Sequence, residues 1–150
     1  MTPAFRLATL LKLREQTRVE RRRELAQAFE AEQILRDRAA QMQSDIEATQ
    51  QRTRTAAQGS VNVETLLHAR RYELTVKGQL AEIQRQIVQV LEEIERRRHA
   101  LLEADRDVKV LEKLRELQAA QHAAVEQKRE NRQLDEAGLR GFARRQEATP

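Results

Sequence analysis

A repeat of apolar residues, spaced alternately three and four apart, runs through the second half of the chain from Leu66 to Leu111. Its fourteen positions are Leu66, Ala69, Glu73, Val76, Leu80, Ile83, Ile87, Val90, Ile94, Arg97, Leu101, Ala104, Val108 and Leu111, and only Glu73 and Arg97 are polar. A repeat that lasts this long places one apolar stripe along a continuous helix, which is the signature of a coiled coil. The stripe needs a partner helix, because an isolated helix buries almost nothing.

The first half of the chain provides a weaker matching stripe. Its apolar members are Leu11, Leu25, Ala28, Leu35, Ala39, Met42 and Ile46, and its polar interruptions are Arg14, Arg18, Arg21 and Glu32. We therefore expect the two halves to pair with each other, with a partly wet seam on the side of the first half.

One internal segment, TAAQGSVNVE at residues 55–64, has the composition of a loop. Gly59 and Ser60 can end a helix there, and Ser60 or Asn62 can cap the next one. The two prolines, Pro3 and Pro150, lie at the ends of the chain, so no proline interrupts the helices between them. The charged fraction of 35% and the aromatic fraction of 3% also fit long helices better than a compact globule.

The predicted fold is all-α: a long antiparallel two-helix coiled-coil hairpin that forms a single domain over residues 1–150, with the second helix longer than the first. The predicted segments are a first helix at about 4–56, a turn at about 57–62 and a second helix at about 63–143. A short turn makes the helices antiparallel neighbours and brings Leu11 level with Val108 and Met42 level with Val76. The hairpin should close near residue 115, and the second helix should continue past Leu117 as an overhang with a frayed C-terminal tail.

Basic residues concentrate at the end of the hairpin that lies away from the turn. The concentration consists of Arg6, Lys12, Arg14, Arg18, Arg21, Arg22 and Arg23, joined at about the same level by Arg96, Arg97 and Arg98. These residues predict a basic collar that could meet an acidic protein surface, although a solvated flank paired with Glu93, Glu95 and Asp105 would have the same sequence. The net charge of only +4 and the lack of interleaved aromatic residues argue against a dedicated nucleic-acid binder.

No arrangement of residues predicts catalysis. No two of His68, His99 and His122 have the i,i+4 spacing that places two imidazoles side by side on a helix, and the chain has no cysteine and no glycine-rich phosphate loop. We expect a protein that is not an enzyme and that has no cofactor and no metal. No run of eighteen apolar residues occurs, so the expected location is cytoplasmic.

Four segments in order resemble the FliJ family of the bacterial flagellar type III export apparatus. They are FRLATLLKLRE near the start, ARRYELTVKGQL after the turn, ERRRHALLEADRDVKVLEKLRE in the second helix and NRQLDEAGLRGFARR near the end. The resemblance extends over nearly the whole chain. It implies a central-stalk-like coiled coil that binds the hexameric export ATPase (FliI) and the export-gate protein (FlhA) and escorts export chaperones. The protein would be an elongated monomer, associated peripherally with the inner-membrane export apparatus through these partners.

The resemblance also implies two docking surfaces. The ATPase-docking residues would be Arg21, Arg22, Arg23, Leu111, Leu114, Leu134, Asp135 and Glu136. The export-gate-docking residues would be Tyr72, Val76, Met42 and Gly78. Arg38, Asp45 and Thr49 depart from the family's pattern around the second surface.

Tyr72 flanks the seam just before Glu73, so its ring could simply cover the edge of the seam while the hydroxyl reaches water. Two neighbours favour docking instead. Glu73 interrupts the seam, and Gly78 removes a side chain from the same helix, so we expect loose pairing with Met42 and Ala39 and a shallow notch beside the tyrosine.

Three alternative functions share the coiled-coil pattern: a homo-oligomerising scaffold, a stalk homologue from an injectisome, and a basic rod associated with nucleic acid. A stable dimer in solution would favour the scaffold, and duplex-DNA binding with a steep salt dependence would favour the rod.

Overall fold

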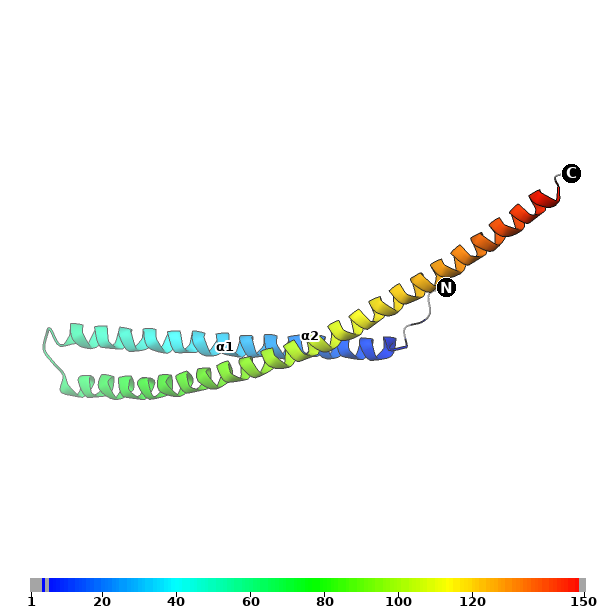
Figure 1. Ribbon diagram of the computed structural model, residues 1–150. Coiled ribbons are helices and arrows are strands. Elements are labelled where there is room, and N and C mark those ends of the chain that lie inside the picture. The colour runs from blue at the N-terminus through cyan, green and yellow to red at the C-terminus, as the bar shows by residue number, and fades with distance from the viewer. Residues whose placement is uncertain (1–3, 5, 149–150) are drawn as a thin grey trace. The chain divides into compact units, whose positions relative to one another are not determined.

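The computed structural model describes residue 4 and residues 6–148, so Pro3 and Pro150 lie outside the described residues. It contains helix α1, Ala8–Ala56, and helix α2, Val63–Glu147, with 49 and 85 residues (Figure 1). No strand occurs in the described part of the chain. The prediction of an all-α hairpin of two helices, the second longer than the first, is confirmed.

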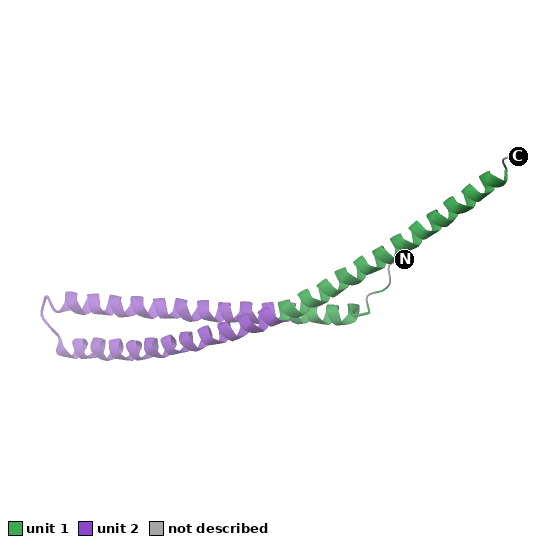
Figure 2. Cartoon of the chain, in the orientation of Figure 1, with its two compact units in different colours: residues 1–18, 104–150 green, residues 19–103 purple. Residues whose placement is uncertain are grey.

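The chain divides into two compact units, and each unit contains part of both helices (Figure 2). The hairpin unit comprises residues 19–103, with the turn and the two helix segments beside it. The terminal unit comprises residues 1–18 and 104–150. The sequence predicts a single hairpin over residues 1–150, whereas the contacts group the residues into these two units.

The hairpin unit turns between Ala56 and Val63, and Asn62 immediately precedes the second helix. The side-chain Oδ1 of Asn62 accepts a hydrogen bond from the backbone N–H of Glu64 at 3.1 Å, and its carbonyl accepts one from Leu66 at 3.2 Å. Asn62 is therefore the N-cap, which satisfies a backbone N–H that has no partner within the helix. Gly59 lies in the turn without a positive φ, so α1 does not end in a left-handed glycine cap.

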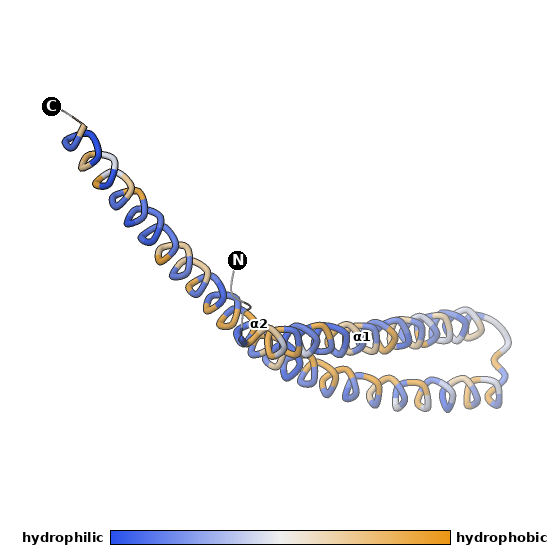
Figure 3. The backbone as a smooth tube through the Cα atoms, turned by 90° about the vertical axis from the view of Figure 1, so that its right-hand side faces the viewer, coloured by the Kyte–Doolittle hydropathy of each residue, from blue (hydrophilic) through white to orange (hydrophobic). Residues whose placement is uncertain are grey.

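The predicted seam of α2 is confirmed at all fourteen positions, each of which is buried or half-buried. In the hairpin unit the buried apolar residues are Ala28 and Ile46 on α1 and Val76, Ile83 and Ile94 on α2. Orange apolar bands recur along both helices in Figure 3, separated by blue polar stretches. The pattern follows because the three-and-four spacing returns to one face of the helix, while the positions between face solvent.

The pairing register of the hairpin unit differs from the predicted one by about one helical turn. Gln50 bonds Glu73 across the helices, and Arg36 and Ala39 line a hollow together with Gln84 and Ile87. Stepping one turn along each helix from the Gln50–Glu73 pair brings Ile46, rather than Met42, level with Val76. The predicted pairing of Met42 with Val76 is wrong because the first turn of α2 extends beyond the end of α1, an offset that the loop sequence does not encode.

The terminal unit has a small apolar cluster of its own, formed by Leu11, Val108 and Leu111. The cluster brings Leu11 together with Val108, as predicted, and also with Leu111, one turn farther along α2. Arg18 lies beside it and donates a hydrogen bond of 3.4 Å to Asp105. Arg14 reaches Asp107 at 3.4 Å, so two of the arginines that interrupt the first stripe are paired with acids of α2.

The outer ends of the two helices differ from the predicted bounds by four residues each, whereas the ends beside the turn lie at Ala56 and Val63. Helix α1 begins at Ala8 rather than near residue 4, and the described residues just before it offer no Ser, Thr, Asp or Asn to cap an earlier start. Helix α2 reaches Glu147, beyond the predicted 143 and into the segment expected to fray. Gly138 and Gly141 do not end it, because a glycine inside a helix costs only about 1 kcal/mol relative to alanine.

Ile94 provides a test of the seam, because its side chain is 2% exposed. Ile94→Ala should lower the free energy of unfolding by about 2–4 kcal/mol through lost burial and a residual cavity. The change is measured by urea denaturation followed by circular dichroism. Val88→Ala on the same helix, at a side chain that is 56% exposed, should change it by less than about 0.5 kcal/mol. Equal losses in the two variants would contradict the seam.

Candidate functional site

The tyrosine on α2 lies at the edge of the seam with its side chain half in solvent. Tyr72 is 50% exposed, whereas Val76, one turn farther along the helix, is 5% exposed. Residues four apart on a helix lie on the same face, so the buried valine is the neighbour of Tyr72 along that face. The aromatic surface is therefore available to a partner, and Val76 itself presents almost none.

Met42 and Gly78, the other two residues predicted for this surface, lie apart from that edge. Met42 lines an open hollow of about 460 Å³ with Gln79, Ile83 and three other residues, one to two turns along α2 from Val76. Gly78 is exposed, and a Cβ added there would meet no atom within 4 Å. The glycine therefore leaves room for close approach from outside, but it does not line the hollow beside Met42.

Glu73 does not loosen the seam as the sequence suggested, because its buried carboxylate is fully partnered. Lys77 Nζ lies 2.5 Å from Oε1, Gln50 on α1 donates a hydrogen bond of 2.8 Å to the same oxygen, and Arg70 lies 3.3 Å from Oε2. The hydrogen bonds from Lys77 and Gln50 lower the pKa of Glu73 from 4.5 to about 2. Two of these donors lie on α2 itself, and Gln50 links the charged carboxylate to α1, which makes Glu73 a clamp between the helices beside Tyr72.

The arginines of the predicted collar that lie in the hairpin unit are mostly paired. Arg21 bonds Glu24 at 2.9 Å and Arg23 lies 3.8 Å from Glu20, while Arg22 is exposed and takes part in no ion pair among the described residues. On α2, Arg96 and Arg97 share Glu93, and Arg98 pairs with Glu95. The paired, solvated flank that the sequence left open thus describes most of this part of the collar.

Two contacts across the helices reinforce the same region. Arg97, the second polar member of the α2 seam, donates a hydrogen bond to the backbone carbonyl of Glu24 on α1. Its bond with Glu93 is the main cause that lowers the pKa of that carboxyl. The guanidinium of Arg98 lies 5.4 Å from the centre of the Phe29 ring, within the range of a cation–π interaction. Arg97 and Arg98 therefore attach α2 to α1 through a hydrogen bond and a cation–π contact in addition to the apolar seam.

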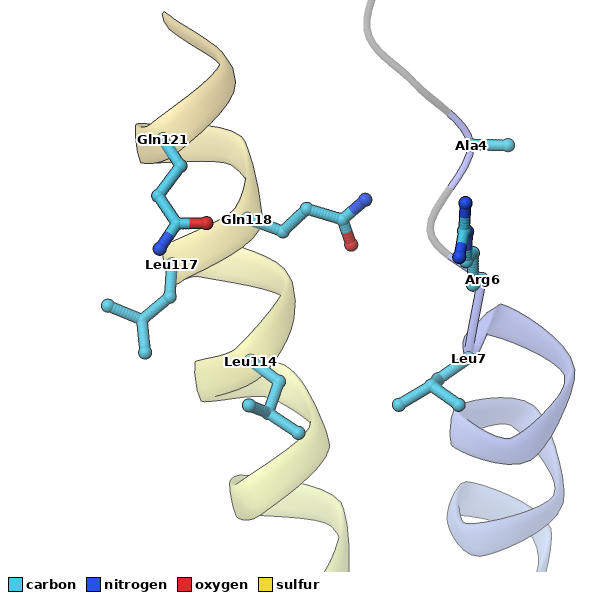
Figure 4. Close-up of a pocket in the computed structure, with 7 residues that line it drawn as sticks. All are labelled: Ala4, Arg6, Leu7, Leu114, Leu117, Gln118 and Gln121. Carbon is cyan, nitrogen blue, oxygen red and sulfur yellow. The ribbon is translucent and has the colours of Figure 1, made fainter. Parts of the chain in front are cut away.

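An open apolar hollow of about 660 Å³ lies in the terminal unit, between the start of α1 and α2. Its lining is Ala4, Arg6, Leu7, Leu114, Leu117, Gln118 and Gln121, and Leu7, Leu114 and Gln118 extend toward the opposite segment (Figure 4). Leu114 is 43% exposed, so a predicted ATPase-docking residue contributes to an accessible apolar surface. The sequence does not indicate this hollow, because leucines just outside the regular seam give no periodic signal.

The remaining predicted ATPase-docking residues of the terminal unit have different environments. Leu111 is 7% exposed in the cluster with Leu11 and Val108, so its side chain packs the interior. Leu134 is 69% exposed, and Asp135 and Glu136 beside it are also exposed. Every residue from 127 to 148 is exposed, which leaves this length of α2 open to a partner.

The described residues lack two kinds of feature. In residue 4 and residues 6–148, no group of three or more His, Asp or Glu side chains is placed to hold a metal ion. Over the same residues, neither helix has a stretch long and apolar enough to cross a membrane.

The lowered pKa of Glu73 predicts an acid-sensitive clamp. Because the folded pKa of about 2 lies below the ordinary value of 4.5, the clamp should stabilise the protein fully above about pH 4.5 and be lost progressively as the pH falls toward 2. Melting temperatures measured across this range should fall less steeply for Glu73→Gln than for the unmodified chain. Glu92→Gln, at an exposed position of the same helix, is the matched control. Identical pH profiles for Glu73→Gln and the unmodified chain would contradict the clamp.

Comparison with known proteins adds to this geometry. No curated protein matches the chain, and no solved structure matches it. The model of one family, described as flagellar FliJ protein, matches residues 3–147, which is nearly the whole chain. That match, together with the two-helix hairpin, shows that the chain belongs to the FliJ family and is a component of the flagellar protein export apparatus.

Proposed function

We propose that this chain is a non-catalytic, stalk-like hairpin that binds the hexameric export ATPase and the export-gate protein and escorts export chaperones. The observation that carries the proposal is the match of the FliJ family model to residues 3–147. A fold of two helices suits such a role, because it buries one narrow stripe and leaves the other faces for partners.

The gate-docking part of the proposal is centred on Tyr72. An exposed aromatic ring above a buried valine is well suited to anchor an interface, because it offers apolar area at little cost in side-chain entropy. The space next to Gly78 would allow close approach of a partner. Met42 would contribute from the separate hollow with Gln79 and Ile83, so the surface would be longer than a single contact point.

The ATPase-docking part rests on the exposed members of the predicted set. In the hairpin unit these are Arg22 and Arg23, and in the terminal unit they are Leu114, Leu134, Asp135 and Glu136. Leu111 would act only indirectly, by holding Val108 and Leu11 together. Exposed arginines at such a surface would set the association rate and the salt dependence more than the total affinity.

Tyr72→Ala tests the gate-docking surface. The variant should weaken binding to the purified gate protein by about 1–3 kcal/mol, as loss of an interface anchor does, with only a small change in melting temperature. Isothermal titration calorimetry measures the binding. Leu74→Ala, which removes a side chain that is 57% exposed on another face of the same helix, should bind normally. If the Tyr72→Ala variant binds the gate protein normally, or if it unfolds, the tyrosine serves only to pack the hairpin and the docking proposal is wrong.

A double charge reversal tests the arginines. Arg22→Glu with Arg23→Glu should reduce stimulation of the cognate ATPase at low salt, because both side chains are exposed and the bonded Arg21–Glu24 pair is left intact. ATP hydrolysis rates over a salt series give the readout. Arg52→Glu with Arg54→Glu makes the same change in net charge near the turn and should stimulate normally. Equal stimulation by both double variants would exclude Arg22 and Arg23 from the docking surface.

A further inference from the structure

Most of the chain's net charge lies around the turn of the hairpin unit. Residues 48–72, here called the cationic tip, contain four arginines and one acid, Glu64, which gives +3 of the chain's total of +4. Extending the segment to include Glu73 and its partner Lys77 adds one charge of each sign and leaves the balance unchanged. The other 125 residues therefore carry a net charge of only +1.

Within the part of the chain that the structure describes, three of the four arginines of the cationic tip have no acidic partner. Arg70 lies 3.3 Å from Glu73, but no ion pair among the described residues includes Arg52, Arg54 or Arg71. Elsewhere in the chain most arginine-rich stretches are interleaved with acids that pair with them, as Arg96 and Arg98 do with Glu93 and Glu95. The positive field of the tip is therefore not cancelled locally, and it should attract an anionic surface.

The cationic tip also exposes about half or more of three aliphatic side chains. Val61 in the turn is 48% exposed, Val63 at the first position of α2 is 67% exposed, and Leu67 one turn later is 52% exposed. Arg52 and Arg54 precede the turn on α1, and Arg71 follows it on α2, so the apolar residues are bracketed by arginines. Apolar groups flanked by cations are the composition of segments that sit at the boundary between lipid headgroups and acyl chains.

We propose that the cationic tip docks on an anionic lipid surface, with Val61, Val63 and Leu67 entering the headgroup region and Arg52, Arg54 and Arg71 contacting lipid phosphates. A bilayer of this kind supplies negative charge and a hydrocarbon boundary at neighbouring depths, which matches both properties of the tip. A nucleic acid matches the tip less completely, because Tyr72, the last residue of the tip, is its only Phe, Tyr or Trp able to stack on bases, and a nucleic acid offers no hydrocarbon for Val61, Val63 and Leu67. The lipid contact does not depend on the binding of an ATPase or a gate protein.

Vesicle co-sedimentation of the full chain tests the proposal. The chain should pellet with vesicles of phosphatidylcholine containing about 30 mol% phosphatidylglycerol and not with phosphatidylcholine alone. The apparent affinity should fall as salt rises from about 50 to 300 mM, because the Debye length shortens. Reversing the three arginines, as Arg52→Glu, Arg54→Glu and Arg71→Glu, should weaken binding at low salt at least about tenfold.

Matched controls separate the tip from the overall charge. Arg106→Glu, Arg115→Glu and Arg132→Glu make the same charge change at exposed positions of the terminal unit and should retain binding to anionic vesicles within about twofold. Val61→Ser with Val63→Ser should weaken binding several-fold at unchanged charge, while Val88→Ser with Val110→Ser, at side chains 56% and 59% exposed, should not.

Three outcomes would overturn the proposal. The first is failure of anionic vesicles to pellet the chain. The second is equal weakening of binding by the two triple reversals, which would make the attraction a property of net charge alone. Tip-dependent binding to soluble polyglutamate without binding to anionic vesicles would instead assign the surface to an acidic protein. Circular dichroism of each variant checks that the helices are retained, so that a loss of binding can be attributed to the changed surface and not to unfolding.

Discussion

The pairing of one stripe on each helix is the interaction on which both units depend. Two helices without further layers bury only the faces that they turn toward each other, so few side chains lose nearly all their contact with water. Of the larger side chains in the described residues, only Ile94 and Val108 are almost completely buried. The fold therefore holds through many partial burials along the seam, and all other helical faces remain in solvent.

The polar residues of the seam have a role different from that of the apolar ones. Burying an ion pair contributes little net stability, because desolvation offsets the attraction. A buried charge does, however, exclude pairings that would leave it without partners. Glu73 finds Gln50 across the seam, Arg97 finds the Glu24 carbonyl, and Arg18 finds Asp105. Each of these bonds fits one offset between the helices, whereas apolar side chains could slide by a turn and still be buried. The polar members of the seam thus specify the register within each unit.

This division of roles explains which features could be predicted from the sequence. The number of helices, their order and the fourteen seam positions follow from periodicity, since a spacing of three and four residues fixes a helical face whatever the partner. The predicted position of Met42 opposite Val76 was wrong by one helical turn. Apolar periodicity does not indicate how far the first turn of α2 extends beyond the end of α1. The prediction of a loose seam at Glu73 was wrong for a related reason. Its hydrogen-bond donor Gln50 lies on the other helix, and the sequence does not indicate which residue a glutamine beside the seam will bond. The hollow beside Leu7 and Leu114 was missed because it depends on side chains outside the repeat.

The same geometry limits where a partner can bind without disturbing the fold. Val76 and Leu111 belong to the repeat and are buried, so substituting either one would change stability and binding together. Tyr72 and Leu114 occupy positions beside the repeat, where a side chain lies partly over the seam and partly in solvent. Such flanking positions take their rigidity from the seam, because a side chain supported by a buried neighbour loses little further freedom when a partner covers it. In a hairpin of two helices, binding surfaces of defined geometry should therefore follow the edges of the seam, and residues on the far faces should act mainly through charge.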